Sequence, residues 1–149
     1  MSKAASRATK TSDALRTLVR IARTLEHACT ELTLPQYRLL AMVATGDRQA
    51  TQLAGRLALS KPTITAVVDG LVERGLLSRS VVAGDRRAVD LTLTGAGWGA
   101  LEVTEAAMAE RLWRLLDHCE DPELALAGIA QLSQALDAVV AKRLAESGK

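Results

Sequence analysis

The sequence predicts a mostly α-helical fold that contains one small β-hairpin. Hydrophobic residues make up 48% of the 149 residues, which is enough for a folded core, but only 2% are aromatic and none is Phe. The core must therefore consist mainly of Leu, Val and Ala, and Ala-rich periodic stretches favour helix. Apolar and polar residues alternate with period two between residues 77 and 93, which predicts two short strands.

Four helices are predicted ahead of the hairpin. Thr11 and Asp13 offer capping oxygens for the first, and Pro35 suits the first turn of the second because it needs no amide hydrogen bond there. A fourth helix follows a turn at residues 58–60 and ends at Gly75. The predicted ranges of the first three helices are about 12–30, 35–44 and 50–57.

The first turns of the fourth helix show short, uncharged, hydroxyl-bearing side chains on one side, with Lys61 beside them. Ser60 is placed to cap this helix, and Pro62 sets the helical φ angle. Such a helix start suits phosphates and base edges, through free amides, the helix dipole and thymine-methyl contacts. An ordinary capped surface helix would show the same pattern. The side that must face the core carries Ile64, Val67, Val68 and Leu71.

The hairpin carries two arginines in its turn. Residues 77–81 and 89–93 alternate, and the run Ala83-Gly84-Asp85-Arg86-Arg87 lies between them. Arginine is favoured in a narrow minor groove, where the negative potential is enhanced. A generic hairpin with a charged tip is the alternative, but the order helix, turn, helix, hairpin favours a β-wing. We therefore predict a winged helix-turn-helix over residues 35–94, with its second helix in the DNA major groove.

Amphipathic dimerisation helices are predicted on both sides of this unit, over residues 12–30 and 95–146, within a single domain of residues 1–149. Apolar residues recur in them with a period near 3.5, which is typical of a helix that packs on a partner helix. The winged unit alone could hardly bury these stripes, so we expect them to pair two chains; an intramolecular bundle is the alternative. The stripes are Leu15, Leu18, Ala22, Leu25 and Cys29; Trp98, Leu101, Met108, Leu112, Leu115 and Cys119; and Ile129, Leu132, Leu136 and Val139.

Charge is distributed unevenly along the chain. Residues 48–87 hold seven basic and three acidic residues, a balance of +4, and residues 88–149 hold five basic and ten acidic residues, a balance of −5. A basic winged unit suits phosphate binding. We do not expect the polar start to be a secretory signal, and we expect no membrane span, because no apolar run approaches roughly 20 residues. Two cysteines do not make a disulfide framework, so we expect a cytoplasmic protein with no membrane partner.

No arrangement of residues for catalysis is visible. His27 and His118 are the only histidines, and the run Gly95-x-Gly97-x-Gly99 lacks the spacing of a nucleotide-binding loop. We therefore expect no enzyme activity, no cofactor and no metal. Cys29 stays open as a peroxide-sensing thiol, which would need access and a lowered pKa, or as a buried thiol.

Three runs of this sequence resemble the MarR (multiple antibiotic resistance regulator) family of winged-helix transcription factors: LTLPQYRLLAMV, QLAGRLALSKPTITAVVDGLVERGLLSR and GDRRAVDLTLTGAG. The resemblance covers roughly residues 32–97. It rests on the S-K-x-T-x-T helix start, the L-x-x-x-G-L-x-x-R junction and the D-x-R wing followed by L-T, in that order. It implies a homodimer with interlaced N- and C-terminal helices, and two winged domains on a palindromic operator in double-stranded DNA.

The resemblance also implies which residues bind DNA. Carried over by position, Ser60, Lys61, Thr63 and Thr65 would contact the major groove, Arg79 the backbone, Asp85 with Arg87 the minor groove, and Arg86 would be a further wing contact. Members of the family often carry basic residues where this chain has Ala66 and Gly70. We therefore expect this chain to depend more on its wing and on the start of its recognition helix.

These observations predict a dimeric, sequence-specific transcriptional regulator, a repressor that a small aromatic or anionic effector releases from DNA. Tyr37 and Trp98 are candidate walls of an effector pocket, although such residues are more often part of a core. Two alternatives stay open: a winged helix that binds protein, and a regulator that senses oxidants through a thiol. Binding to one palindrome with a steep salt dependence would separate DNA binding from protein binding.

Overall fold

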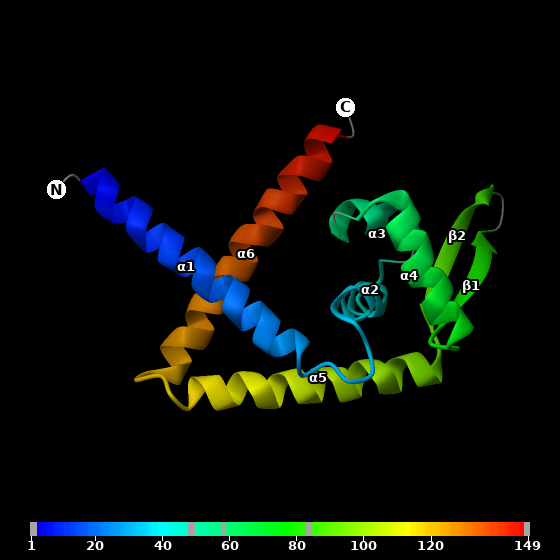
Figure 1. Ribbon diagram of the computed structural model, residues 1–149. Coiled ribbons are helices and arrows are strands. Elements are labelled where there is room, and N and C mark those ends of the chain that lie inside the picture. Colours follow the sequence, from blue (N-terminus) through cyan, green and yellow to red (C-terminus); the bar gives the residue numbers. More distant parts are fainter. Residues whose placement is uncertain (1–2, 48–49, 58, 83–84, 148–149) are drawn as a thin grey trace. The chain divides into compact units, whose positions relative to one another are not determined.

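The computed structural model describes residues 3–47, 50–57, 59–82 and 85–147 (Figure 1). The described chain is mostly helical and contains a two-stranded antiparallel sheet, which confirms the predicted fold class. In chain order the elements are α1 (Lys3–Glu26), α2 (Leu34–Ala44), α3 (Ala50–Leu57), α4 (Lys61–Glu73), β1 (Leu77–Val82), β2 (Asp85–Leu93), α5 (Gly95–Leu116) and α6 (Pro122–Ser147). Its contacts divide the chain into two compact units, Met1–Arg111 and Leu112–Lys149.

The apolar core of the first unit lies among α2, α3, α4, the two strands and the start of α5. Figure 1 shows α2, α3, α4 and the strands grouped together. Burying a leucine side chain contributes roughly 1.5–3 kcal/mol relative to leaving it exposed, so this cluster dominates the stability of the unit. Its fully buried leucines are Leu39, Leu40, Leu53, Leu71 and Leu91.

The core-facing side of α4 is as predicted from residue spacing. Ile64, Val68 and Leu71 are buried, and Val67 is half-buried. Leu101 also enters this core, at 4% exposure. It therefore leaves the apolar stripe of α5 that the sequence analysis assigned to a partner chain.

The hairpin has a shorter turn than predicted. β2 begins at Asp85, so residues 85–87 belong to a strand, whereas the sequence analysis placed them in the turn. The pairing is irregular here, because Val81 lies opposite Val89 while Val82 lies opposite Asp85. Extra residues on β2 account for this shift, as in a β-bulge, which bends a strand locally.

The first helix begins earlier and ends earlier than predicted. The expected range ran from about Thr11–Asp13 to about Thr30, whereas α1 covers Lys3–Glu26. The hydroxyl groups of Thr11 and Thr17 each donate, at 2.9 Å, to the carbonyl four residues earlier. Thr11 therefore bonds within the helix instead of capping it, and the alanines before it are good helix formers.

α6 exposes an apolar face. Leu132 is 61% exposed and Leu136 63% exposed. By length and composition alone, Pro122–Lys142 could cross a membrane, which corrects the expectation that no segment would. One such helix is weak support for a membrane protein, and Asp137 within it would cost roughly 2.5–3.5 kcal/mol near the centre of a bilayer.

The turn after α4 lies directly against the start of α5. The Thr94 amide donates to the Leu76 carbonyl at 3.2 Å, and the Thr94 hydroxyl donates to the Gly75 carbonyl at 2.6 Å. The Gly97 amide in turn donates to Thr94 Oγ1 at 3.0 Å. A Cβ atom on Gly97 would overlap the Leu76 carbonyl oxygen, so this approach requires glycine.

Gly97→Ala is expected to lower the free energy of unfolding by about 1–3 kcal/mol, because the new methyl group meets backbone atoms that cannot rotate away. Gly99→Ala is the matched control, since a Cβ there meets nothing within 4 Å. The control should stabilise the helix by roughly 0.5–1 kcal/mol. Urea unfolding at one fixed protein concentration measures both changes. Equal stability of Gly97→Ala and the parent protein would contradict the close approach.

Candidate DNA interface

The start of α4 is held by local capping groups. Ser60 is the N-cap, and its Oγ accepts a hydrogen bond from the Thr63 amide at 3.3 Å. Pro62 lies in the first turn and has no amide hydrogen. The cap uses the Thr63 amide and Pro62 offers none, so fewer first-turn amides are open to a phosphate than predicted.

The hydroxyl groups at this helix start have defined hydrogen-bonding capacity. Ser60 Oγ and Thr63 Oγ1 lie 2.7 Å apart, so one O–H donates to the other oxygen and the second O–H can donate outward. Thr65 Oγ1 donates to the Lys61 carbonyl at 2.9 Å. Thr65 therefore offers lone pairs and a methyl group to a ligand, which suit base amino groups and the thymine methyl group.

The four residues predicted to contact the major groove lie together on the exposed start of α4. Ser60, Lys61, Thr63 and Thr65 are all exposed, while Ile64 is buried on the opposite side. One ammonium group and three hydroxyl groups thus share one helix end. Their contact with DNA stays a prediction.

Arg79 projects from β1 toward α4, and its guanidinium pairs with the carboxylate of Asp69. The two side chains are 39% and 55% exposed, and at such exposure an ion pair contributes only about 0–1 kcal/mol. The pair therefore serves mainly to orient the Arg79 guanidinium. Asp69 was not among the predicted site residues, although it lies on the exposed side of α4, one turn after Thr65.

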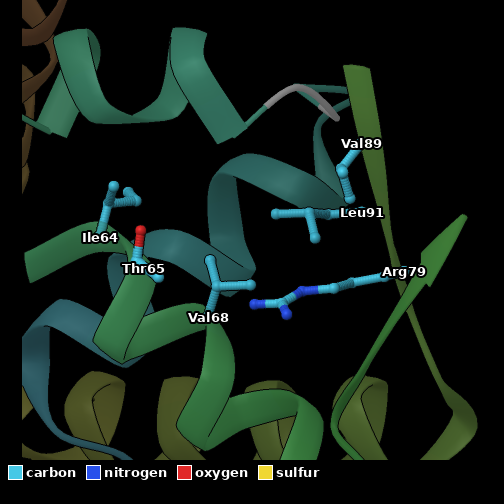
Figure 2. A pocket seen from close by; sticks show the side chains of 6 residues that line it. All are labelled: Ile64, Thr65, Val68, Arg79, Val89 and Leu91. Carbon is cyan, nitrogen blue, oxygen red and sulfur yellow. The ribbon is translucent and has the colours of Figure 1, made fainter. Parts of the chain in front are cut away.

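A cavity of about 220 Å³ lies between α4 and the hairpin. Figure 2 shows Arg79 extending across this cavity with its guanidinium directed toward α4. The aliphatic stem of Arg79 covers apolar walls while the charged group reaches the surface of α4. The lining residues are Ile64, Thr65, Val68, Arg79, Val89 and Leu91.

Both positions where members of the resembled family often carry basic residues have room for a longer side chain on α4. Ala66 is exposed, and a Cβ atom on Gly70 would meet nothing within 4 Å. Packing therefore does not exclude a longer side chain at either position. Their small side chains leave Lys61 as the cation on this helix.

The wing residues are placed by their backbone. Asp85, Arg86 and Arg87 start β2, and their side chains lie outside the described part of the structure. Their predicted contacts with the minor groove therefore stay predictions. The preceding turn residues, Ala83 and Gly84, also lie outside the described residues.

The two residues predicted to line an effector pocket lie on α2 and α5. The Tyr37 hydroxyl donates to Glu105 Oε1 at 3.5 Å, and burial together with the Glu105 carboxylate raises the pKa of Tyr37. Trp98 is 46% exposed. It lies seven residues before Glu105, so both project from the same face of α5. Tyr37 and Trp98 therefore lie toward one side of this helix.

Cys29 is a partly buried free thiol. Burial and the Glu26 carboxylate raise the pKa of the Cys29 thiol, which donates to the Leu25 carbonyl at 3.5 Å. Thiolate is the reactive form, and a raised pKa reduces its fraction at neutral pH. Within the described ranges, no group of three or more His, Cys, Asp or Glu residues could hold a metal ion.

Comparison with known proteins places these elements in a family. The MarR family matches residues 30–88, which include α2, α3, α4 and most of the hairpin. The chain is 31% identical over 96 residues to the HTH-type transcriptional regulator YpoP of Bacillus subtilis. This alignment covers 64% of the chain and 68% of YpoP.

Solved structures share the fold over most of the chain. The PcaV transcriptional regulator from Streptomyces coelicolor, solved with its natural ligand, is 27% identical, with a TM-score of 0.66 over 89% of this chain and 95% of PcaV. The transcriptional repressor CouR, solved on a 23-mer DNA duplex, is 24% identical, with a TM-score of 0.71 over 83% of this chain and 89% of CouR.

The sequence matches and the shared fold agree with the helix start and the hairpin described above. They also set aside the alternative that this winged helix serves only to bind protein. The chain therefore belongs to the MarR family and is a DNA-binding transcriptional regulator, not an enzyme.

Proposed function

We propose that the protein is a homodimeric, cytoplasmic repressor that binds a palindromic operator and is released by a small aromatic or anionic effector. The observation that carries this proposal is the exposed start of α4, where one ammonium group and three hydroxyl groups lie beside the hairpin. CouR, which has the same fold, is a repressor solved on DNA. That likeness supports a repressor here.

In the proposed complex, the start of α4 enters the major groove. Lys61 neutralises a phosphate, while Thr65 offers its lone pairs and methyl group to base edges. Arg79 contacts the backbone, and residues 85–87 enter the minor groove. The winged unit of residues 35–94 binds DNA, and residues 12–30 and 95–146 pair the chains within a single domain of residues 1–149.

Exposed apolar side chains support the proposed dimer. A monomeric soluble protein rarely leaves large contiguous apolar surface in water. A second copy presents the same surface, and a two-fold axis lets each patch pack on its equivalent. The exposed large side chains on the three flanking helices are Leu15, Leu18, Val19, Trp98, Val103, Trp113, Leu115, Leu124, Ile129, Leu132, Leu136 and Val139.

Release from DNA follows from the geometry of such a dimer. Two recognition helices must lie about 34 Å apart to meet successive major grooves. An effector that binds better to a dimer with another spacing shifts the population away from DNA. We place this effector beside Tyr37 and Trp98, and the solved complex of PcaV with its natural ligand supports a ligand-responsive protein.

A titration against the DNA upstream of the protein's own gene, at several salt concentrations, tests the proposed function. We expect sub-micromolar binding to one palindrome, and affinity that falls steeply with salt because counterions are released. Lys61→Ala should weaken binding to all sequences and reduce the salt slope by about one. Lys142→Ala is the control, because this exposed lysine lies on α6 in the other unit. Equal affinity for any duplex would contradict a sequence-specific repressor.

Asp69→Asn should tighten binding to a random-sequence duplex. The change removes a carboxylate from the proposed DNA-facing side of α4 and frees the Arg79 guanidinium. The freed guanidinium can neutralise one further phosphate, so the salt slope should steepen by about one. Fluorescence anisotropy across a salt series measures this slope.

Glu73→Gln is the matched control for Asp69→Asn. Glu73 is an exposed carboxylate one turn further along α4, so its substitution makes the same change in net charge. Equal effects of the two substitutions would show that net charge alone is responsible. The proposed competition between Asp69 and DNA for Arg79 would then be wrong.

Leu136→Asp should convert the dimer to a monomer of 15.8 kDa, because it places a charge in the proposed apolar contact. Gln134→Asp is the control, since an exposed residue two positions earlier points to the other side of α6. Sedimentation equilibrium measures the mass of each variant. If the parent protein is itself a monomer, the proposed dimer is excluded.

A further inference from the structure

Arg74 bridges the end of α4 and the connection between α1 and α2, which are far apart in the sequence. It is the C-cap residue of α4, and its backbone amide donates to the Gly70 carbonyl at 3.2 Å. Its Nη2 donates to the Glu31 carbonyl at 2.8 Å, and its Nη1 donates to Gln36 Oε1 at 3.3 Å. The guanidinium thus joins the end of the recognition helix to the connection between α1 and α2.

The acceptors of Arg74 are themselves held in place. Gln36 Oε1 also accepts from the Thr33 amide at 3.0 Å, and the Gln36 amide donates to Thr33 Oγ1 at 3.4 Å. This capping box fixes the start of α2. Arg74 therefore bonds to a local structure that is already ordered, and it uses the planar fork that distinguishes arginine from lysine.

The bridge lies at the edge of an open cavity. A cavity of about 460 Å³ lies beside it, lined among others by Arg74, Gln36, Glu31 and Cys29. Arg74 is exposed. Leu71 and Leu76 pack into the core on the other side of this helix end, and the Arg74 hydrogen bonds add its contact with the α1–α2 connection.

The fixed end of α4 controls where its other end lies. With a rise of about 1.5 Å per residue, the helix spans about 20 Å, and a tilt of about 5° at Arg74 would displace Lys61 by roughly 1.7 Å. The other side of the same turn is bonded to Thr94 at the start of α5. Both α1 and α5 carry apolar side chains that we assign to the dimer contact.

We propose that Arg74 is a positioning residue for DNA recognition, whose guanidinium sets the angle of α4 relative to the α1–α2 connection and so the spacing of the two recognition helices. This inference rests on the proposed dimer and its palindromic operator. Arg74 contacts no DNA in this arrangement. Loss of the Arg74 side chain widens the range of half-site spacings that the dimer binds, and it leaves the number of phosphate contacts unchanged.

Half-site spacing provides the test. The probes are the upstream duplex that the titration above identifies, and copies with one base pair inserted or deleted at the centre. We expect the parent protein to prefer the native spacing, and Arg74→Ala to reduce that preference by about fivefold or more. The salt slope should stay unchanged. A reduced salt slope with intact spacing preference would mark Arg74 as a phosphate contact and overturn the inference.

Four further variants sharpen the result. Arg74→Lys keeps the charge but loses the fork, so it should behave as Arg74→Ala; it also serves if Arg74→Ala fails to fold. Arg38→Ala removes the same charge from an exposed position on α2, and this variant should keep the preference for the native half-site spacing. Gln36→Ala and Arg74→Ala both remove the hydrogen bond between Arg74 and Gln36. The double variant should therefore lose less of the preference for native spacing than the sum of the losses in the two single variants.

Two outcomes separate this inference from the function on which it rests. If the parent protein shows no preference among the three duplexes, the proposed dimer on a palindrome is wrong. The proposed role of Arg74 is then wrong as well. If the parent protein shows the preference and both Arg74 variants keep it, the dimer stands and the positioning role alone is overturned.

Discussion

The backbone of α5 lies against the Leu76 carbonyl with no room for a side chain at Gly97. The same turn ends α4, where Gly75 takes a φ angle of +69°, and leads directly into β1. Because Thr94 bonds to the carbonyls of Gly75 and Leu76, the end of β2 returns to the point where β1 begins. The end of α4, the hairpin and the start of α5 are therefore tied together at one turn.

Local rules made the centre of the fold predictable. The side chain of Ser60, the ring of Pro62 and the spacing of Ile64, Val68 and Leu71 act within a few residues, and α4 forms as they indicate. The bounds of α1 were missed because a threonine hydroxyl has two local options. Thr11 could cap a helix or bond to a carbonyl four residues earlier, and the helix-forming residues before it favour the second.

The candidate site was predictable only in part, because its ion pair and its bridge depend on tertiary structure. The exposed hydroxyl groups at the start of α4 follow from the helix period. The pairing of Asp69 with Arg79 needs the hairpin to fold back on α4. The hydrogen bond from Arg74 to the Glu31 carbonyl spans 43 residues. Its acceptor is a backbone carbonyl, which every residue has, so the type of residue at position 31 does not indicate this bond. The need for glycine at position 97 likewise depends on its tertiary contact with Leu76.

On the proposed interface, the composition of α4 favours discrimination between DNA sequences over strength of binding. Non-specific binding is electrostatic and depends on cations that neutralise phosphates, whereas hydroxyl and methyl groups carry information about base edges. Ala66 and Gly70 supply no charge, and Asp69 holds the Arg79 guanidinium. On the proposed interface, each of these features lowers affinity for any duplex while leaving Thr65 free to contact bases. Such a helix needs the rest of the protein to hold it in place, because a few short side chains read base edges only when the helix lies at the correct depth and angle.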